Sequence, residues 1–148
     1  MSVPRPVRFG APEWCAALRD EVNASSEYRN AAAKWGAGFN GNLLFVFEKD
    51  AALPSPLALF LALSGGRCER VEFVPGPSHP EAGVTLRAPF TLWRDVLERR
   101  TLAATAILRG KMKVDGDRLT LLKHAGANRA LLHCTASVPT EFPAAPRP

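Results

Sequence analysis

Side chains that could act as acids, bases or nucleophiles are few and widely separated in this sequence of 148 residues. The histidines and cysteines are His79, His124, His133, Cys15, Cys68 and Cys134. No nucleophile elbow, phosphate-binding loop or paired-carboxylate motif accompanies them. The cysteines also lack the spacing of zinc ligands. We therefore expect a protein that is not an enzyme and that uses neither a cofactor nor a metal.

Two of the histidines have neighbours that could suggest a role. His133 stands next to Cys134, but neighbours on a helix point about 100° apart and rarely share a proton or a metal. His79 lies among prolines in a predicted loop, where we expect an exposed side chain. Neither pattern indicates catalysis.

The cysteines and the first residues indicate the compartment. Three cysteines far apart in the sequence argue against a disulfide framework. The segment Met1–Pro6 lacks the apolar stretch of a secretory signal, and no apolar run approaches the length of a membrane-spanning helix. We expect a cytoplasmic protein.

The chain is basic, with 19 Lys and Arg against 14 Asp and Glu and a formal net charge of +5. Such an excess could favour anionic partners. Basic residues such as Arg5, Arg67, Arg99 and Lys113 are spread along the sequence, which favours a solvated surface. No nucleic-acid-binding signature occurs and aromatic residues are not interleaved with the charges, so we expect no nucleic acid partner.

The apolar periodicity and the capping residues predict several helices. Pro12 followed by Glu13 is a helix-start pattern, and Ser25 or Ser26 can cap a second helix that ends near Trp35. Later helices are predicted over Pro89–Arg99, from a cap at Thr101 to Leu108, and from Arg118 to about Ala136 with an interruption near Gly126.

Five segments have the composition of strands: Asn42–Lys49, Leu57–Leu63, Cys68–Val74, Gly83–Arg87 and Lys111–Val114. Short loops between the first four predict an antiparallel meander, in which the charged segment Cys68–Val74 is an edge or half-exposed strand. We therefore predict an α+β fold, a five-stranded, mainly antiparallel sheet covered by amphipathic helices.

The stretch Ala103–Leu119 connects these elements. Gly110 suits the left-handed closure of one helix, and Asp117 can cap the next. Helix, strand and helix thus meet within 17 residues.

One domain is expected over residues 1–148, with 1–8 and 139–148 loosely ordered because they are rich in proline. The strand Asn42–Lys49 is apolar on both faces, so each face must be covered, and the predicted helices can supply both covers. The packing could be complete, or it could leave a gap that an apolar molecule fills.

Several motifs, taken in order, resemble the sterol carrier protein type-two family, and in particular its stand-alone bacterial branch. They are Pro12–Trp14, Asn23–Tyr28, Trp35, Gly65–Cys68, Val84–Leu86, Trp93 and Arg109–Asp117. The last motif is the most specific, since it resembles the family signature Gly-Lys-apolar-Lys-apolar-x-Gly-Asp/Asn. The resemblance extends from about Phe9 to Leu122.

The resemblance implies an apolar cavity between sheet and helices that binds, and could transfer inside the cell, a fatty acid, an acyl ester or another lipid. Residues from the sheet and the later helices would line it: Phe45, Phe47, Leu59, Leu61, Val84, Leu86, Trp93, Leu97, Leu102, Met112, Leu119 and Leu122. The alternative is an interaction module that uses the same apolar surface to bind a protein partner or to form a homodimer. Transient contact with a membrane surface is left open.

Overall fold

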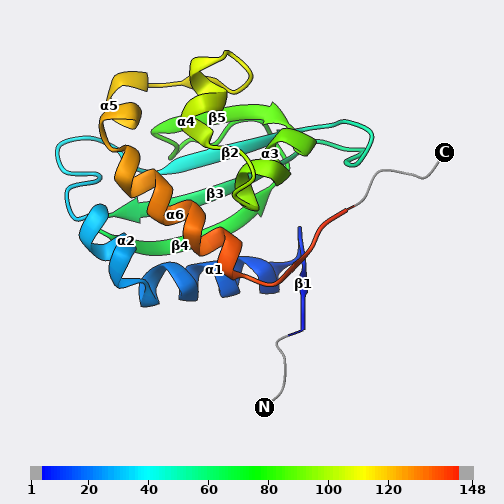
Figure 1. Ribbon diagram of the computed structural model, residues 1–148, viewed down its shortest axis with the longest axis horizontal. Helices are drawn as coiled ribbons and strands as arrows, with labels where there is room; N and C mark the ends of the chain where they lie inside the picture. Colours follow the sequence, from blue (N-terminus) through cyan, green and yellow to red (C-terminus); the bar gives the residue numbers. More distant parts are fainter. Residues whose placement is uncertain (1–4, 144–148) are drawn as a thin grey trace.

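A five-stranded sheet runs through the centre of residues 5–143, the part of the chain that the computed structural model describes. Its strands are β2 (Leu43–Glu48), β3 (Leu57–Ser64), β4 (Arg67–Val74), β5 (Val84–Pro89) and β6 (Lys113–Asp115). They lie in the order β4, β3, β2, β5, β6 (Figure 1). Only the β2–β5 pair is parallel, so the predicted five-stranded, mainly antiparallel sheet is confirmed.

The strand order corrects the predicted meander. The chain leaves β4, crosses back over the sheet through residues 75–83 and places β5 beside β2, with Leu43 opposite Val84. β4 carries the exposed residues Glu69 and Arg70 and stays at the edge, as its composition predicted. The continuously apolar β2 takes the centre, where both of its edges are paired.

In the described part of the chain six helices accompany the sheet: α1 (Pro12–Ala24), α2 (Ser26–Ala31), α3 (Phe90–Leu97), α4 (Ala103–Leu108), α5 (Arg118–Lys123) and α6 (Ala125–Ser137). The predicted cap of α2 is present, because the Tyr28 N–H donates to Ser25 Oγ over 3.0 Å. Asp117 caps α5 in the same way through the Thr120 N–H, also over 3.0 Å. Gly110 follows α4 with φ 73°, the left-handed closure that the sequence indicated.

Three predicted helix boundaries were wrong. The second helix was expected to end near Trp35, but α2 ends at Ala31 and turns follow it. Thr101 does not cap α4, because the helix begins at Ala103 and Leu102 occupies the cap position. The Thr101 N–H closes the turn after α3 by donating to the Asp95 carbonyl. The predicted last helix divides at His124 rather than at Gly126. The His124 ring packs edge-on against Trp35, with ring centroids 5.4 Å apart, which fixes the direction of the chain at the break.

Segments near the two ends pair with each other. β1 (Val7–Arg8) and β7 (Thr140–Glu141) form a two-stranded parallel sheet, and Trp14 Nε1–H donates to Thr140 Oγ1 over 2.8 Å. These residues correct the expectation that 1–8 and 139–148 are loosely ordered. Residues 1–4 and 144–148, which the same expectation included, lie outside the described residues.

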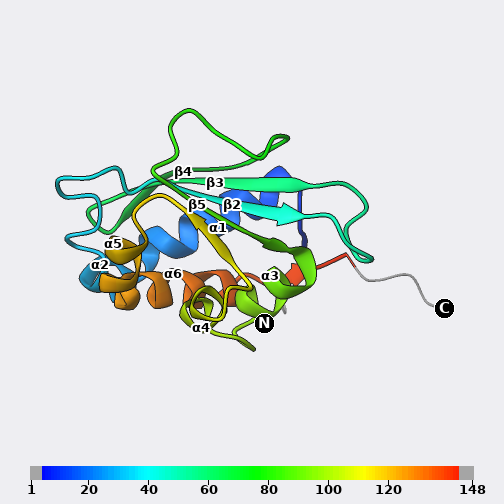
Figure 2. The same cartoon turned by 90° about the horizontal axis from the view of Figure 1, so that it is seen from above.

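The two faces of the sheet are covered differently. Leu43, Phe45 and Phe47 face the helices and belong to the main core. On the opposite face, a second buried cluster consists of Leu44, Val46, Ala58, Phe60 and Ala62, and no helix contributes a residue to it. Figure 2 shows the 75–83 loop on this side, away from α3, α4, α5 and α6. The expectation that helices cover both faces was therefore wrong.

An aromatic stack seats the loop on the second cluster. The His79 ring lies parallel to the Phe60 ring, with centroids 3.9 Å apart and an interplanar angle of 10°. The Arg70 guanidinium lies 5.3 Å from the centroid of the same phenyl ring. His79 is thus half-buried on an apolar surface rather than exposed as predicted.

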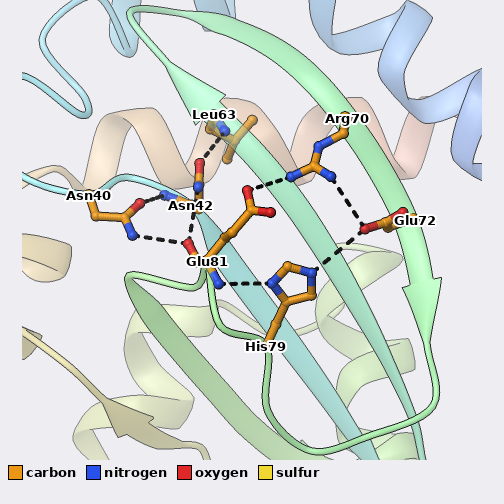
Figure 3. Close-up of polar contacts among 7 residues, drawn as sticks. All are labelled: Asn40, Asn42, Leu63, Arg70, Glu72, His79 and Glu81. Atoms are coloured by element: carbon orange, nitrogen blue, oxygen red, sulfur yellow. Dashed lines mark hydrogen bonds and ion pairs between the residues drawn. The ribbon is translucent and has the colours of Figure 1, made fainter.

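Polar contacts centred on Glu81 hold the loop in place (Figure 3). Its carboxylate meets Arg70 Nη2 at 2.6 Å, and its N–H donates to His79 Nδ1 over 3.1 Å. Its carbonyl accepts hydrogen bonds from the side-chain amides of Asn40 and Asn42, at 3.0 and 3.1 Å. The loop is therefore attached to β4 and to the segment before β2.

Two glycines provide a matched test of this packing. A Cβ at Gly83 would collide with the backbone carbonyl of Asn40, whereas a Cβ at Gly126 in α6 would meet open space. We predict that Gly83→Ala lowers the free energy of unfolding by about 1–3 kcal/mol through overpacking. Gly126→Ala should raise it by roughly 0.4–1 kcal/mol. Urea denaturation followed by circular dichroism measures both, and equal effects of the two substitutions would contradict the loop packing described here.

Candidate functional site

A pocket of about 160 Å³ lies on the helix-covered face of the sheet. β2 and β5 form its floor, and α3, α4 and the α5–α6 pair form its walls. Its apolar lining consists of Leu43, Phe45, Leu86, Trp93, Val96, Leu102, Ala103, Ala104, Ile107, Leu121, Leu122, Ala125, Leu131 and Leu132. Its polar lining consists of Arg99, Thr101, Asn128, Arg129 and His133.

Trp93 fixes the floor of the pocket. Its indole Nε1–H donates to the Val46 carbonyl over 2.9 Å, and its ring stacks on Phe45 with centroids 4.6 Å apart. This hydrogen bond satisfies the polar atom of a side chain that is otherwise buried among apolar groups. The single hydroxyl proton of Thr135 is shared between the Leu132 carbonyl at 2.8 Å and the Leu97 carbonyl at 3.3 Å, and the second contact joins α6 to the end of α3. The floor and two walls are thereby set in fixed positions.

The α4 wall is held more loosely. This helix has six residues, no side chain caps its first turn, and its buried residues are Ala106 and Ile107. The turn that leads into it contains Arg99 in a left-handed conformation, with φ 64°, which is uncommon for a residue other than glycine. Short helices depend on tertiary packing for stability, so displacement of α4 costs less than displacement of α3 or α6, which bury more residues.

Positive charge borders the pocket. Arg99 and Arg129 are both exposed, and neither makes an ion pair with another of the described residues. His133 Nδ1 meets Glu27 Oε1 at 2.6 Å, and Asn128 Nδ2 donates to the Leu121 carbonyl over 2.9 Å. The two guanidinium groups therefore remain available to an anionic group at the pocket.

The structure brings together five of the residues predicted from sequence, since Phe45, Leu86, Trp93, Leu102 and Leu122 line the pocket. Six others are buried in the core away from it: Phe47, Leu59, Leu61, Val84, Leu97 and Met112. Leu119 is 80% exposed, because Asp117 starts α5 in an orientation that turns Leu121 inward and Leu119 toward solvent.

Sequence reasoning missed the contribution of α6. Ala125, Asn128 and Leu132 line the pocket and are separated by three and four residues, the spacing of one helix face. Because the sequence predicted a helix in this region, the spacing of these three residues could have indicated that they share one face and line the same site. Ile107 of α4 and Leu43 of β2 were also missed.

A second hollow lies between α1 and β4. It is lined by Gly10, Pro12, Cys15, Ala16, Arg19, Arg70, Val71, Glu72 and Phe73. Its volume is larger, about 420 Å³, but it is open and bordered by charged side chains. We take the apolar pocket as the candidate site, because ligand sites are typically concave and mostly apolar with a few polar groups.

The sequence matches the SCP-2 sterol transfer family over residues 17–127. The chain belongs to this family. The resemblance noted from the motifs is thereby confirmed, and the match covers the sheet, the pocket floor and the α4–β6–α5 region. No curated protein sequence matches the chain significantly.

Solved structures of family members have the same architecture. The crystal structure of a sterol carrier protein 2 is 27% identical, covers 88% of this chain and 98% of its own, and superposes with a TM-score of 0.77. A conserved hypothetical protein from Thermus thermophilus is 26% identical, with coverages of 90% and 91% and a TM-score of 0.78. The apo form of sterol carrier protein 2 from Yarrowia lipolytica, 17% identical with coverages of 86% and 92% and a TM-score of 0.55, shares the fold.

The potentially reactive groups are engaged in packing. Cys15, Cys68 and Cys134 are free and buried. Burial raises the pKa of Cys15 from 9.0 to about 11 and that of Cys68 to about 12, and it also raises the pKa of Cys134. Residues 5–143 contain no group of three His, Cys, Asp or Glu side chains placed to hold a metal ion. No helix within the same residues is long and apolar enough to cross a bilayer.

The raised thiol pKa values predict slow alkylation. Only the thiolate reacts, so at roughly pH 8 a pKa raised by about two units lowers the reactive fraction about a hundredfold. We expect iodoacetamide to label Cys15 and Cys68 at least about a hundred times more slowly in the native protein than in the protein unfolded in urea. Labelling of Cys134 should also be slower in the native protein, and peptide mass spectrometry identifies the labelled cysteines. Rapid labelling of one native cysteine would show that its surroundings are open.

Proposed function

We propose that this protein binds a single-chain lipid, a fatty acid or an acyl ester, in the pocket between the sheet and α3, α4 and α6. The observation that carries the proposal is the pocket itself, which has an apolar floor and walls. At its border stand two arginines, Arg99 and Arg129, that make no ion pair within residues 5–143. Membership of the SCP-2 sterol transfer family supports the binding of apolar lipids in general.

The volume of the pocket bears on how a ligand is bound. A cavity of about 150 Å³ admits a molecule the size of benzene, so a pocket of about 160 Å³ accepts only a short part of an acyl chain. Burial contributes about 0.8 kcal/mol per methylene, and roughly six such groups would barely offset the freedom lost on binding. Micromolar binding of a long chain thus requires a deeper pocket, and displacement of α4 is the simplest way to provide it.

The border of the pocket favours an anionic head group. Arg99 and Arg129 lie beside an apolar cavity, and a carboxylate is the group that guanidinium binds in a bidentate manner. A fatty acid would place its chain against Phe45 and Trp93 and its carboxylate near the arginines. This arrangement favours a fatty acid over a sterol, whose polar end is an uncharged hydroxyl.

The lining supports binding without catalysis. It contains no serine, cysteine or carboxylate, and its one histidine, His133, is paired with Glu27. We therefore propose that the ligand is carried rather than converted, and that release to an acceptor completes an intracellular transfer.

The structure weakens one argument for the alternative, an interaction module. It rested on two apolar sheet faces, but both are covered within the chain: Leu44, Ala58 and Phe60 of the second face are 0% exposed. The sheet therefore requires neither a partner nor a second copy, and the pocket remains the stronger basis for a function.

Ala104 is suited to a test, since it lines the pocket and is only half-buried. We predict that Ala104→Trp fills the pocket and weakens binding of a fluorescent fatty acid at least about tenfold, which corresponds to about 1.4 kcal/mol. Fluorescence titration of delipidated protein, with palmitic acid as competitor, measures the loss. Mass spectrometry of gently purified protein should also detect a bound lipid.

The matched control is Ala136→Trp, which adds the same side chain at an exposed position of α6 outside the pocket. It should bind as tightly as the unmodified protein, and thermal melts should show that both variants are folded. If Ala104→Trp binds normally, or if neither titration nor mass spectrometry detects a ligand, the pocket is not a lipid site.

A further inference from the structure

The net charge of the protein resides on one segment. The segment from Arg99 to Lys123 contains seven of the 19 basic residues and two of the 14 acidic residues. The rest of the chain therefore has twelve basic and twelve acidic residues. This segment alone therefore accounts for the formal charge of +5, although the basic residues looked scattered along the sequence. It contains α4, the following loop, β6 and α5, and we call it the α4–α5 edge.

The basic residues of the α4–α5 edge are mostly free of counter-charges. Arg100 pairs with Asp95 and Glu98, whereas the other six make no ion pair within residues 5–143. The two acidic residues of the edge are already engaged: Asp115 pairs with Arg87 at 3.0 Å, and Asp117 caps α5. Positive charge is thus left without compensation at this edge.

The same segment carries the exposed large apolar side chains. Among the described residues these are Leu102, Leu108 and Leu119, which are 61%, 67% and 80% exposed. Arg118 Nη2 donates to the Ile107 carbonyl over 3.3 Å, and so holds the start of α5 against the end of α4. Figure 1 shows α4, the loop after it and α5 along one edge, at the top of the view. Leu102 also lines the pocket, so this edge adjoins it.

Exposed leucines among uncompensated basic residues are the features of a surface that lies on an anionic bilayer. Apolar side chains enter the boundary between head groups and acyl chains, while Lys and Arg are attracted to anionic head groups. An acidic protein partner would satisfy the charges but would not by itself explain exposed leucines next to an apolar pocket.

We propose that the α4–α5 edge docks this protein on the surface of an anionic lipid bilayer, with Leu108 and Leu119 entering the interface. In the docked molecule the pocket lies next to the membrane, because Leu102 belongs both to the pocket lining and to the α4–α5 edge. Movement of α4 at the interface would then let a lipid enter the pocket without crossing water. This last step rests on the proposed function, whereas docking itself does not.

Vesicle sedimentation of the whole protein tests the docking. The vesicles are pure phosphatidylcholine, or phosphatidylcholine and phosphatidylglycerol in equal parts. We expect binding to the anionic vesicles only, weakened by salt. Each basic residue near an anionic surface strengthens binding about fivefold, so Arg109→Gln combined with Lys111→Gln should lower the partition coefficient roughly twentyfold. Leu108→Ser combined with Leu119→Ser should lower it about tenfold or more.

The charge-matched control is Lys34→Gln combined with Lys49→Gln, which removes two exposed lysines outside the edge. It should bind vesicles as the unmodified protein does. Equal loss in this control, equal binding to neutral vesicles, or unchanged binding by the edge variants would overturn the proposal. If light scattering shows a dimer that Leu108→Ser dissociates, the edge is instead a contact between two copies.

Fatty acid titration separates this proposal from the proposed function. Leu108 does not line the pocket, so Leu108→Ser should bind the fluorescent fatty acid normally while its vesicle binding falls. Loss of vesicle binding with intact fatty acid binding is the expected result. Vesicle binding by a protein that takes up no fatty acid would support docking and reject the lipid pocket.

Discussion

Burial of the central strand on both faces is the constraint from which the rest of the structure follows. β2 is apolar at every position from Leu43 to Phe47, so each face of the sheet needs its own cover. The helices cover one face and the 75–83 loop covers the other. A loop can lie flat on a sheet, as His79 does on Phe60, whereas cylindrical helices meet a sheet with gaps that side chains must fill. The apolar pocket is one such gap.

The sequence predicted best what is decided locally. Pro12, Ser25, Gly110 and Asp117 act at the ends of their helices through contacts with residues at most a few positions away. The parallel pairing of β2 with β5 was missed, because it depends on a crossing of the chain that no local pattern encodes. The position of His79 was missed for the same reason: its partner Phe60 lies on another strand.

In the candidate site, too, local features were predicted and features that depend on long-range packing were missed. Phe45 and Phe47 lie on one face of one strand, and both contact Trp93, Phe45 by stacking and Phe47 edge-on. Only Phe45 lines the pocket, whereas the other neighbours of Phe47 are Phe9 and Phe90. Periodicity identifies the inward face but not the position along it. Leu59 and Leu61 lie one strand further from β5, a distance that becomes known only with the strand order. Residues of α4 and α6 enter the site through helix packing, which the sequence leaves open.

The pairing of β1 with β7 determines how this molecule can be handled in the laboratory. The first and last strands lie side by side, in a region of Figure 1 well away from α4 and α5. An affinity handle or a surface anchor joined to the chain at either end would therefore be attached near this strand pair. Protein immobilised through such an anchor would present its α4–α5 edge to the liquid, an orientation suited to sensor chips and supported bilayers.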